Sequence, residues 1–186
     1  MTTHDNFICL DLGSSVTGWA YFSLGVLRES GVLKFKTRVI KKIKQPRAVR
    51  YLQFAEALEN SLTDDSVFGC VAPKLIVYEL CRGNWINASA PEAYHAMLAL
   101  LEIHAYKHNI ELFPVTQTTL KKIGTGKGNA KKELIMESAA LRWPDVDIQT
   151  HDQADAMLLG DCYFRRDEWY GKKKKKKKKK TSSKHK

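Results

Sequence analysis

Four acidic residues occupy positions where a carboxylate needs a specific reason to be present. Asp11 directly follows the apolar run Phe-Ile-Cys-Leu, and Glu79 directly follows Leu-Ile-Val-Tyr. Asp152 and Asp155 lie three residues apart, so they share one face if their segment is helical. A carboxylate at the end of a buried strand is unfavourable unless positive charge compensates it.

These acids are chemically suited to bind hard divalent cations. Four converging carboxylates repel one another unless cations neutralise them. Oxygen-only ligand sets suit Mg²⁺ or Mn²⁺. Two such ions roughly 3.5–4 Å apart can activate water and stabilise the leaving oxygen in phosphodiester hydrolysis. Each acid alone also has an ordinary explanation as a helix first-turn charge, a salt-bridge partner or a turn residue, so the metal hypothesis depends on all four together.

The apolar pattern predicts the elements that would position these acids. The expected strands are 7–12, 17–22, 26–36, 74–79 and 110–115. The expected helices are 47–62, 89–108, 130–143 and 152–168, with a short helix at 120–123. Three consecutive strands followed by alternating helices and strands predict an α/β fold. Its mixed five-stranded sheet would combine an antiparallel three-strand meander with parallel strands and be flanked by helices.

Composition predicts one globular domain with a basic end. The chain has 186 residues, 44% of them hydrophobic, and a net charge of +11. Eleven of its 31 Lys and Arg residues follow Gly171, so the remaining 20 equal in number the 20 Asp and Glu residues. We expect a nuclease domain at 1–170 and a disordered poly-lysine tail at 171–186 that attracts phosphates without reading sequence. The polar start and the lack of a long apolar run predict no membrane segment and a cytoplasmic location.

A second basic segment lies inside the domain. Eight basic residues and no acid occur between Ser30 and Ala55: Lys34, Lys36, Arg38, Lys41, Lys42, Lys44, Arg47 and Arg50. They indicate either a solvated sheet edge and loop or a phosphate-binding patch.

Four segments together resemble the RuvC-like Holliday junction resolvases, most closely the phage-encoded members. They are Asp11-Leu-Gly-Ser-Ser-Val-Thr-Gly18, Ile76-Val-Tyr-Glu79, the lysine- and glycine-rich stretch 119–132, and Asp152-Gln-Ala-Asp-Ala156. They occur in family order and span nearly all of the chain before the tail. The resemblance implies a ribonuclease H-like fold and a homodimer that nicks two opposed strands of four-way DNA junctions with divalent metal. For a phage protein the location would be the host cell cytoplasm.

The resemblance also implies roles for individual residues. The metal ligands would be Asp11, Glu79, Asp152 and Asp155, holding two Mg²⁺ or Mn²⁺ ions. Lys132 would complete the catalytic set by contacting the scissile phosphate or the attacking water. The residues expected to contact DNA are Lys121, Lys122, Lys127, Lys131, Lys132, Arg82 and Trp85.

One position departs from the family pattern. Bacterial members carry an aromatic about one helical turn after the strand glutamate, where this chain has Arg82, and the nearest aromatic is Trp85. Trp85 is therefore either a wedge that stacks on a junction base or a buried structural residue. His151 either assists the water or simply precedes the helix that carries Asp152.

The expected function is structure-selective cleavage of branched DNA that leaves a 3′-hydroxyl and a 5′-phosphate. We expect a symmetric dimer, with helix 89–108 as its hypothetical interface. One alternative is a less selective flap- or branch-cleaving viral nuclease that clears DNA before packaging. Another is an ATP-binding protein of the actin and sugar-kinase type, although such chains are longer and repeat the unit. A third is a noncatalytic DNA-binding module, which leaves the acids unexplained.

Overall fold

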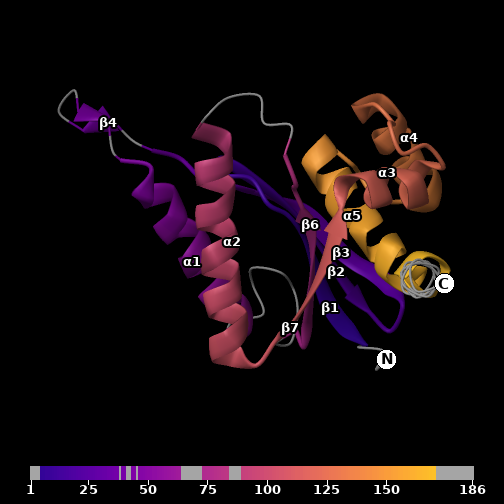
Figure 1. The fold of residues 1–186 in the computed structure, drawn as a ribbon, viewed down its shortest axis with the longest axis horizontal. Coiled ribbons are helices and arrows are strands. Elements are labelled where there is room, and N and C mark those ends of the chain that lie inside the picture. Colours follow the sequence, from indigo (N-terminus) through magenta and orange to yellow (C-terminus); the bar gives the residue numbers. More distant parts are fainter. Residues whose placement is uncertain are drawn as a thin grey trace, which may run out of the picture.

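Five strands form one mixed sheet in the order β3-β2-β1-β6-β7 (Figure 1). The computed structural model describes residues 5–37, 39–40, 43–44, 46–63, 73–83 and 89–170. The five strands are β1 (Asn6–Asp11), β2 (Val16–Ser23), β3 (Val26–Lys34), β6 (Leu75–Leu80) and β7 (Glu111–Thr116). The first three pair antiparallel, whereas β1 with β6 and β6 with β7 pair parallel. The predicted mixed five-stranded α/β sheet is therefore confirmed.

Helices cover both faces of this sheet. One face is covered by α1 (Ala48–Thr63) and α2 (Ser89–His108). The opposite face is covered by α3 (Gln117–Thr125), α4 (Lys132–Arg142) and α5 (His151–Phe164). Within the described ranges, no helix has the length and apolar character needed to cross a bilayer.

Alternation along β1 divides the interior into two cores. Phe7 and Cys9 pack in the core beneath α5, whereas Ile8 and Leu10 pack in the core beneath α1 and α2. Successive side chains of a strand point to opposite faces, so Asp11 faces α5. The parallel neighbour β6 alternates in phase, with Leu75 and Val77 in the α5 core, and its acid therefore faces the same way.

Helix α5 lies close against the sheet because its buried surface includes small residues at the points of closest approach. Ala154 and Ala156 are fully buried. A Cβ placed on Gly160 would lie 2.3 Å from ring atoms of Phe22. A larger side chain at this position would push the helix away from β2 and shift its first turn.

Several element bounds differ from the sequence predictions. In place of the expected short helix at 120–123, the structure has the longer α3. This helix follows β7 directly, and the extended residue Thr116 is its N-cap. The helix expected at 152–168 is interrupted once: α5 ends at Phe164, there is a turn at 165, and residues 166–170 are helical again. The indole of Trp169 in this last turn donates to the Cys162 carbonyl at 3.0 Å. A hairpin of β4 (Val39–Ile40) and β5 (Ile43–Lys44) was not predicted. It lies in the basic segment, where the many charged residues obscure the alternation of apolar and polar residues that indicates a strand.

Candidate active site

Three of the predicted acids meet at the edge of the sheet where the parallel strands end. Asp11 comes from the end of β1, Glu79 from β6 and Asp155 from the start of α5. One carboxylate oxygen from each lies within 4.8 Å of the other two. Glu79 is only 4% exposed, and the other two are partly buried. Residues more than 140 positions apart thus bring their carboxylate oxygens together in one cluster.

The electrostatics of this acidic cluster oppose three simultaneous negative charges. Burial, then the charges of Glu79 and Asp155, raise the pKa of Asp11 well above its usual value. Burial likewise raises the pKa of Glu79, and burial with the neighbouring acids raises the pKa of Asp155 to about 7. The Oδ1 atom of Asp155 is buried and has no hydrogen-bond partner among the described residues. An all-oxygen donor set with an unpartnered buried oxygen fits a hard divalent cation.

The fourth predicted ligand, Asp152, lies beside this acidic cluster. Its charge raises the pKa of both Asp11 and Asp155, so it faces the same space. It is not part of the 4.8 Å group, and its Oδ2 lies 3.7 Å from Nδ1 of His151. The structure thus brings three acids together and places the fourth beside them, and the ligand role of Asp152 stays a prediction.

The turn after β1 explains the spacing of the first motif. Thr17 is fully buried, and its hydroxyl donates to the Gly13 carbonyl at 3.1 Å. Gly18 pairs directly with Asp11 across β1 and β2. A Cβ on Gly18 would lie 1.9 Å from the Asp152 carbonyl oxygen. Only glycine leaves room for the α5 backbone here, so this residue brings the helical acids to the strand acids.

Gln153, between the two helical acids, anchors the start of α5, a role that the sequence interpretation missed. Its side chain is buried; its Oε1 accepts from the Gln149 amide at 3.0 Å, and its Nε2 donates to the Ser30 hydroxyl at 3.1 Å. Thr150 caps the helix by accepting from the Gln153 amide at 3.2 Å. A buried amide with several partners fixes the turn that carries both acids. The sequence signal for this role was the presence of a polar residue, Gln153, on a helix whose neighbouring residues face the core.

Contacts with α2 and with the end of β6 hold Glu79. The Tyr94 hydroxyl donates to the Glu79 carbonyl at 2.9 Å and accepts from the Cys81 amide at 3.2 Å. The Cys81 thiol lies 3.7 Å from Oε1 of Glu79. Burial and the nearby acids raise the pKa of Cys81 to about 12, so it stays a neutral thiol that donates to the carboxylate. Neither Tyr94 nor Cys81 was identified from the sequence.

Two lysines on the α3–α4 side act on the acids electrostatically. Lys121 lowers the pKa of Glu79, and Lys121 and Lys132 both lower that of Asp155, against the larger effect of burial. The Lys132 ammonium contacts Nε2 of His151. A cavity of about 380 Å³ opens at this point. It is lined by Lys132, Glu133, Met136, Gln149, Thr150, His151 and Asp152.

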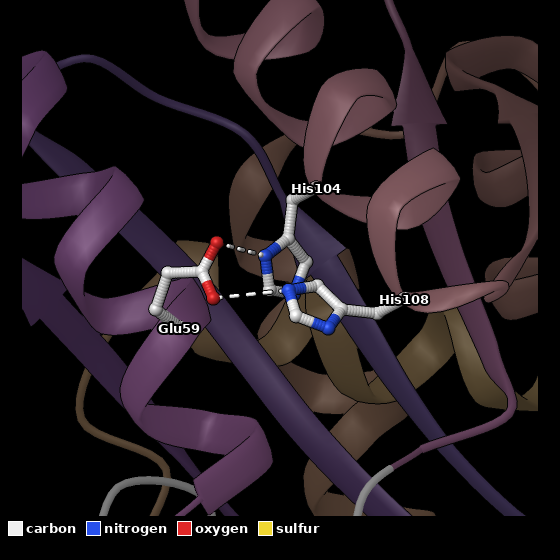
Figure 2. Close-up of side chains that lie close together, drawn as sticks. All are labelled: Glu59, His104 and His108. Carbon is white, nitrogen blue, oxygen red and sulfur yellow. Dashed lines mark hydrogen bonds and ion pairs between the residues drawn. The ribbon is translucent and has the colours of Figure 1, made fainter.

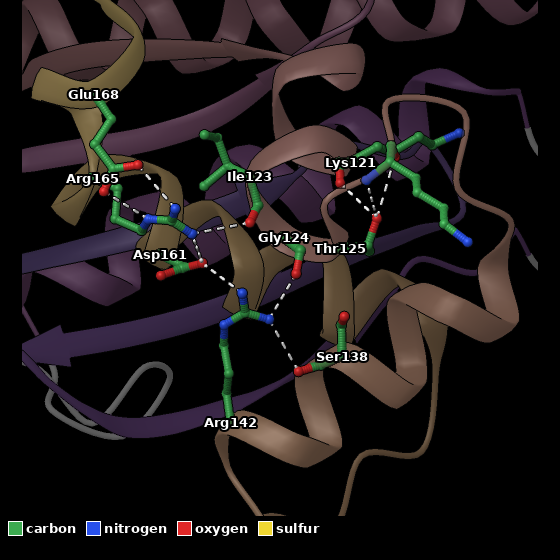
Figure 3. A network of polar contacts seen from close by, with 10 residues as sticks. Lys121, Ile123, Gly124, Thr125, Ser138, Arg142, Asp161, Arg165 and Glu168 are labelled. Carbon is green, nitrogen blue, oxygen red and sulfur yellow. Dashed lines mark hydrogen bonds and ion pairs between the residues drawn. The ribbon is translucent and has the colours of Figure 1, made fainter.

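The other predicted DNA-contacting residues are exposed where the structure describes them. Lys122, Lys127 and Lys131 surround the α3–α4 connection, and Arg82 follows β6. Trp85 lies outside the described residues, as does the tail at 171–186. Thr125 shapes the connection by donating to the Lys121 carbonyl at 2.7 Å (Figure 3).

A polar network ties the lysine-bearing helices to α5 (Figure 3). Arg142 on α4 donates to the Gly124 carbonyl at 2.7 Å and pairs with Asp161 on α5 at 3.2 Å. Arg165, just after α5, donates to the Ile123 carbonyl at 3.2 Å. These bonds hold the lysine-rich connection in a fixed position relative to the acids.

The basic segment between Ser30 and Ala55 is only partly described. Arg47 pairs with the exposed Glu92 at 3.1 Å. Arg50 donates to the Ser15 hydroxyl at 2.7 Å, which ties α1 to the turn after β1. Of the predicted patch, these two arginines are therefore engaged within the protein, while the side chains at 38–45 lie outside the described residues.

Solved structures resemble the chain over nearly its full length, although no protein-family model and no curated protein matches it. RuvC from Thermus thermophilus has a TM-score of 0.65 at 15% identity, covering 87% of this chain and 95% of that one. The T. thermophilus RuvC complex with Holliday junction substrate gives 0.65 at 14%, covering 85% and 92%. The yeast mitochondrial Holliday junction resolvase Ydc2 gives 0.55 at 14%, covering 89% and 80%. At these identities the shared property is the fold, and the expected RuvC-like, ribonuclease H-like fold is confirmed.

Proposed function

We propose that this chain is a divalent-metal-dependent endonuclease that resolves four-way DNA junctions by paired phosphodiester hydrolysis. The observation that carries the proposal is the meeting of Asp11, Glu79 and Asp155 within 4.8 Å at the edge of a RuvC-like sheet. One structure of that fold is a complex with a Holliday junction substrate, which supports branched DNA as the substrate class.

The cofactor we propose is Mg²⁺ or Mn²⁺, two ions in each site, held by these three acids with Asp152 beside them. Bound there, the ions would supply an activated water and stabilise the leaving oxygen. The acids form such a site because Gly18, Thr17 and Gln153 fix the strand ends against α5. Burial and then mutual repulsion raise the pKa values of Asp11 and Asp155, and both effects favour cation binding over an ion-free cluster of carboxylates.

Lys132 is the protein group we propose to meet the reacting phosphate. It lies at the opening of the cavity beside Asp152, and its charge reaches Asp155. An ammonium placed there stabilises the negative charge that builds on phosphate oxygens during displacement. Its contact with His151 restricts where the ammonium can lie. His151 is thus proposed to position Lys132, a more specific role than that of a helix-start neighbour.

Five further cations near the chain segments that carry the site are proposed to grip neighbouring phosphates. Lys121, Lys122, Lys127 and Lys131 lie on α3 or between α3 and α4, and Arg82 follows β6. Such contacts give affinity without base reading, so selection would depend on the shape of the junction. In this proposal residues 1–170 form the nuclease domain, the lysine tail adds sequence-independent affinity, and Trp85 is a candidate wedge.

A homodimer is part of the proposal because a four-way junction has two-fold symmetry and needs two cuts. One active site per subunit would nick each opposed strand. The less selective branch-cleaving nuclease is the alternative that uses the same site, and substrate comparison separates the two.

The test uses purified protein with labelled four-way, three-way and flap DNA, in Mg²⁺ or in EDTA. We expect paired, symmetric nicks on the four-way junction in Mg²⁺ only, with 3′-hydroxyl and 5′-phosphate ends. Asp11→Asn and Asp155→Asn should abolish nicking while junction binding persists. Equal cleavage of all three substrates would support the less selective nuclease. Nicking in EDTA, or full activity of Asp155→Asn, would refute the metal site.

A further inference from the structure

A second group of metal-binding side chains lies away from the acids. Glu59 projects from α1, and His104 and His108 project from α2 one helical turn apart (Figure 2). One ligand atom from each lies within 4.8 Å of the others. We propose that these three residues form a transition-metal site, with Zn²⁺ as the preferred ion, that joins α1 to α2.

The donor chemistry of this group differs from that of the acidic cluster. Two imidazole nitrogens and one carboxylate oxygen suit Zn²⁺ or Co²⁺, whereas Mg²⁺ prefers oxygen ligands alone. Histidines at i and i+4 lie on the same face of a helix, so both can reach one ion. Three protein ligands leave a coordination position open for water or a small anion.

The side chains are already spaced for such an ion. Nδ1 of His104 lies 3.3 Å from Oε1 of Glu59, and Nε2 of His108 lies 3.0 Å from Oε2. Two ligand atoms about 2.05 Å from zinc at a tetrahedral angle lie about 3.3 Å apart. Figure 2 shows both rings turned toward the carboxylate. A cation would therefore replace the hydrogen-bonded protons with little movement of the side chains.

Burial of His104 argues against a simple surface ion pair. Its side chain is 4% exposed, and its Nε2 is buried without a hydrogen-bond partner among the residues the structure describes. Glu59 is 48% exposed and His108 is 35% exposed. An exposed ion pair contributes little to stability. The group thus combines one buried ring with two accessible ligands through which an ion can enter.

The location assigns the site a structural or regulatory role. His108 ends α2 just before β7 begins, whereas Asp11 lies at the opposite end of the parallel strands and faces the other helical layer (Figure 1). No reacting phosphate held at the acids would reach this ion. An ion here would instead fasten α1 to α2 over the core that contains Phe54 and Leu58 of α1 and Leu101 of α2.

The test uses Co²⁺ as a spectroscopic probe with the full-length protein in excess Mg²⁺, which fills the oxygen site. We expect about one equivalent of Co²⁺ with the intense visible absorption of a four-coordinate site, displaced by Zn²⁺. His108→Ala and Glu59→Gln should abolish the signal, and both change accessible side chains. His95→Ala, an exposed histidine on the same helix, is the matched control and should retain it.

Thermal unfolding supplies an independent readout. At 100 times its dissociation constant, Zn²⁺ should raise the Tm of the wild type by roughly 5–10 °C and leave the Tm of His108→Ala unchanged. Mg²⁺-dependent nicking should persist in both variants. A Co²⁺ signal that survives in His108→Ala and Glu59→Gln, or a wild type that binds no Co²⁺, would overturn the proposal. So would a Zn²⁺-induced Tm shift that is equal in the wild type and His108→Ala.

Discussion

Replacing Asp155 by asparagine should stabilise the metal-free protein while abolishing its activity. The pKa of Asp155 is raised to about 7, mainly by burial and then by Glu79 and Asp152. Its reference value in the unfolded chain is 3.8. That difference corresponds to about 4 kcal/mol of unfavourable free energy when the folded carboxylate is ionised. Because the neighbouring acids can hold the proton instead, we expect roughly half, about 2 kcal/mol, to be recovered.

The sign of the effect defines the pH window. Between about pH 4 and pH 7 the folded wild type holds a proton that the unfolded chain has released, so its stability falls as pH rises through this window. The asparagine side chain of the variant cannot ionise. The stability gain of Asp155→Asn should therefore be near zero at pH 4 and complete above pH 7. For a chain of this length about 2 kcal/mol corresponds to a Tm increase of roughly 4–8 °C.

The assay is thermal or denaturant unfolding in EDTA from pH 4 to pH 8, repeated with Mg²⁺. Mg²⁺ should raise the Tm of the wild type at pH 8 and raise that of Asp155→Asn much less, because one ligand is lost. Asp145→Asn makes the same chemical change at an exposed site and should show neither effect. A metal-free Asp155→Asn that is no more stable than wild type at pH 8, or a gain independent of pH, would refute the argument that burial and neighbouring charge destabilise the ionised carboxylate.

Three further outcomes follow from the site. Gly18→Ala should lower the free energy of unfolding by roughly 1–3 kcal/mol and the nicking rate by about 10²-fold, because its Cβ would lie 1.9 Å from the Asp152 carbonyl oxygen. Unfolding and nicking curves equal to those of the wild type would contradict this. Lys132→Met should slow nicking by about 10²-fold and reduce the salt slope of junction binding by about 0.9, whereas Lys107→Met on the opposite layer should do neither. At limiting Mg²⁺ the nicking rate should rise with pH up to about 7, as Asp155 loses its proton, and a flat profile from pH 5 to 8 would disprove the link.

The strand acids and the order of the elements were predictable because they depend on local patterns. Apolar runs that end in Asp11 and Glu79 predict buried strands, and parallel strands bring such ends to one edge. The spacing of Asp152 and Asp155 gives their shared helical face. The confirmed sheet follows from these signals, whereas the ligand role of Asp152 depends on side-chain distances that no spacing rule supplies.

The supporting contacts could not be predicted because they join residues far apart in the chain. Gln153 bonds to Ser30, 123 positions away. Glu59 meets His104 across 45 positions, and neither residue belongs to a recognised motif. Such contacts depend on how α1 packs on α2 and how α5 packs on the sheet, which is decided by shape rather than by local periodicity.

The alternation of β1 makes this strand intolerant of changes in length. Phe7 and Cys9 belong to one core, and Ile8 and Leu10 to the other. Deleting one codon among them would reverse the facing of the residues that follow and turn the carboxylate of Asp11 toward the α1–α2 layer. In a library of single-codon deletions, variants within this strand should be absent from the active pool. Evolution of this chain would then proceed by substitution in β1 and by insertion only at its loops.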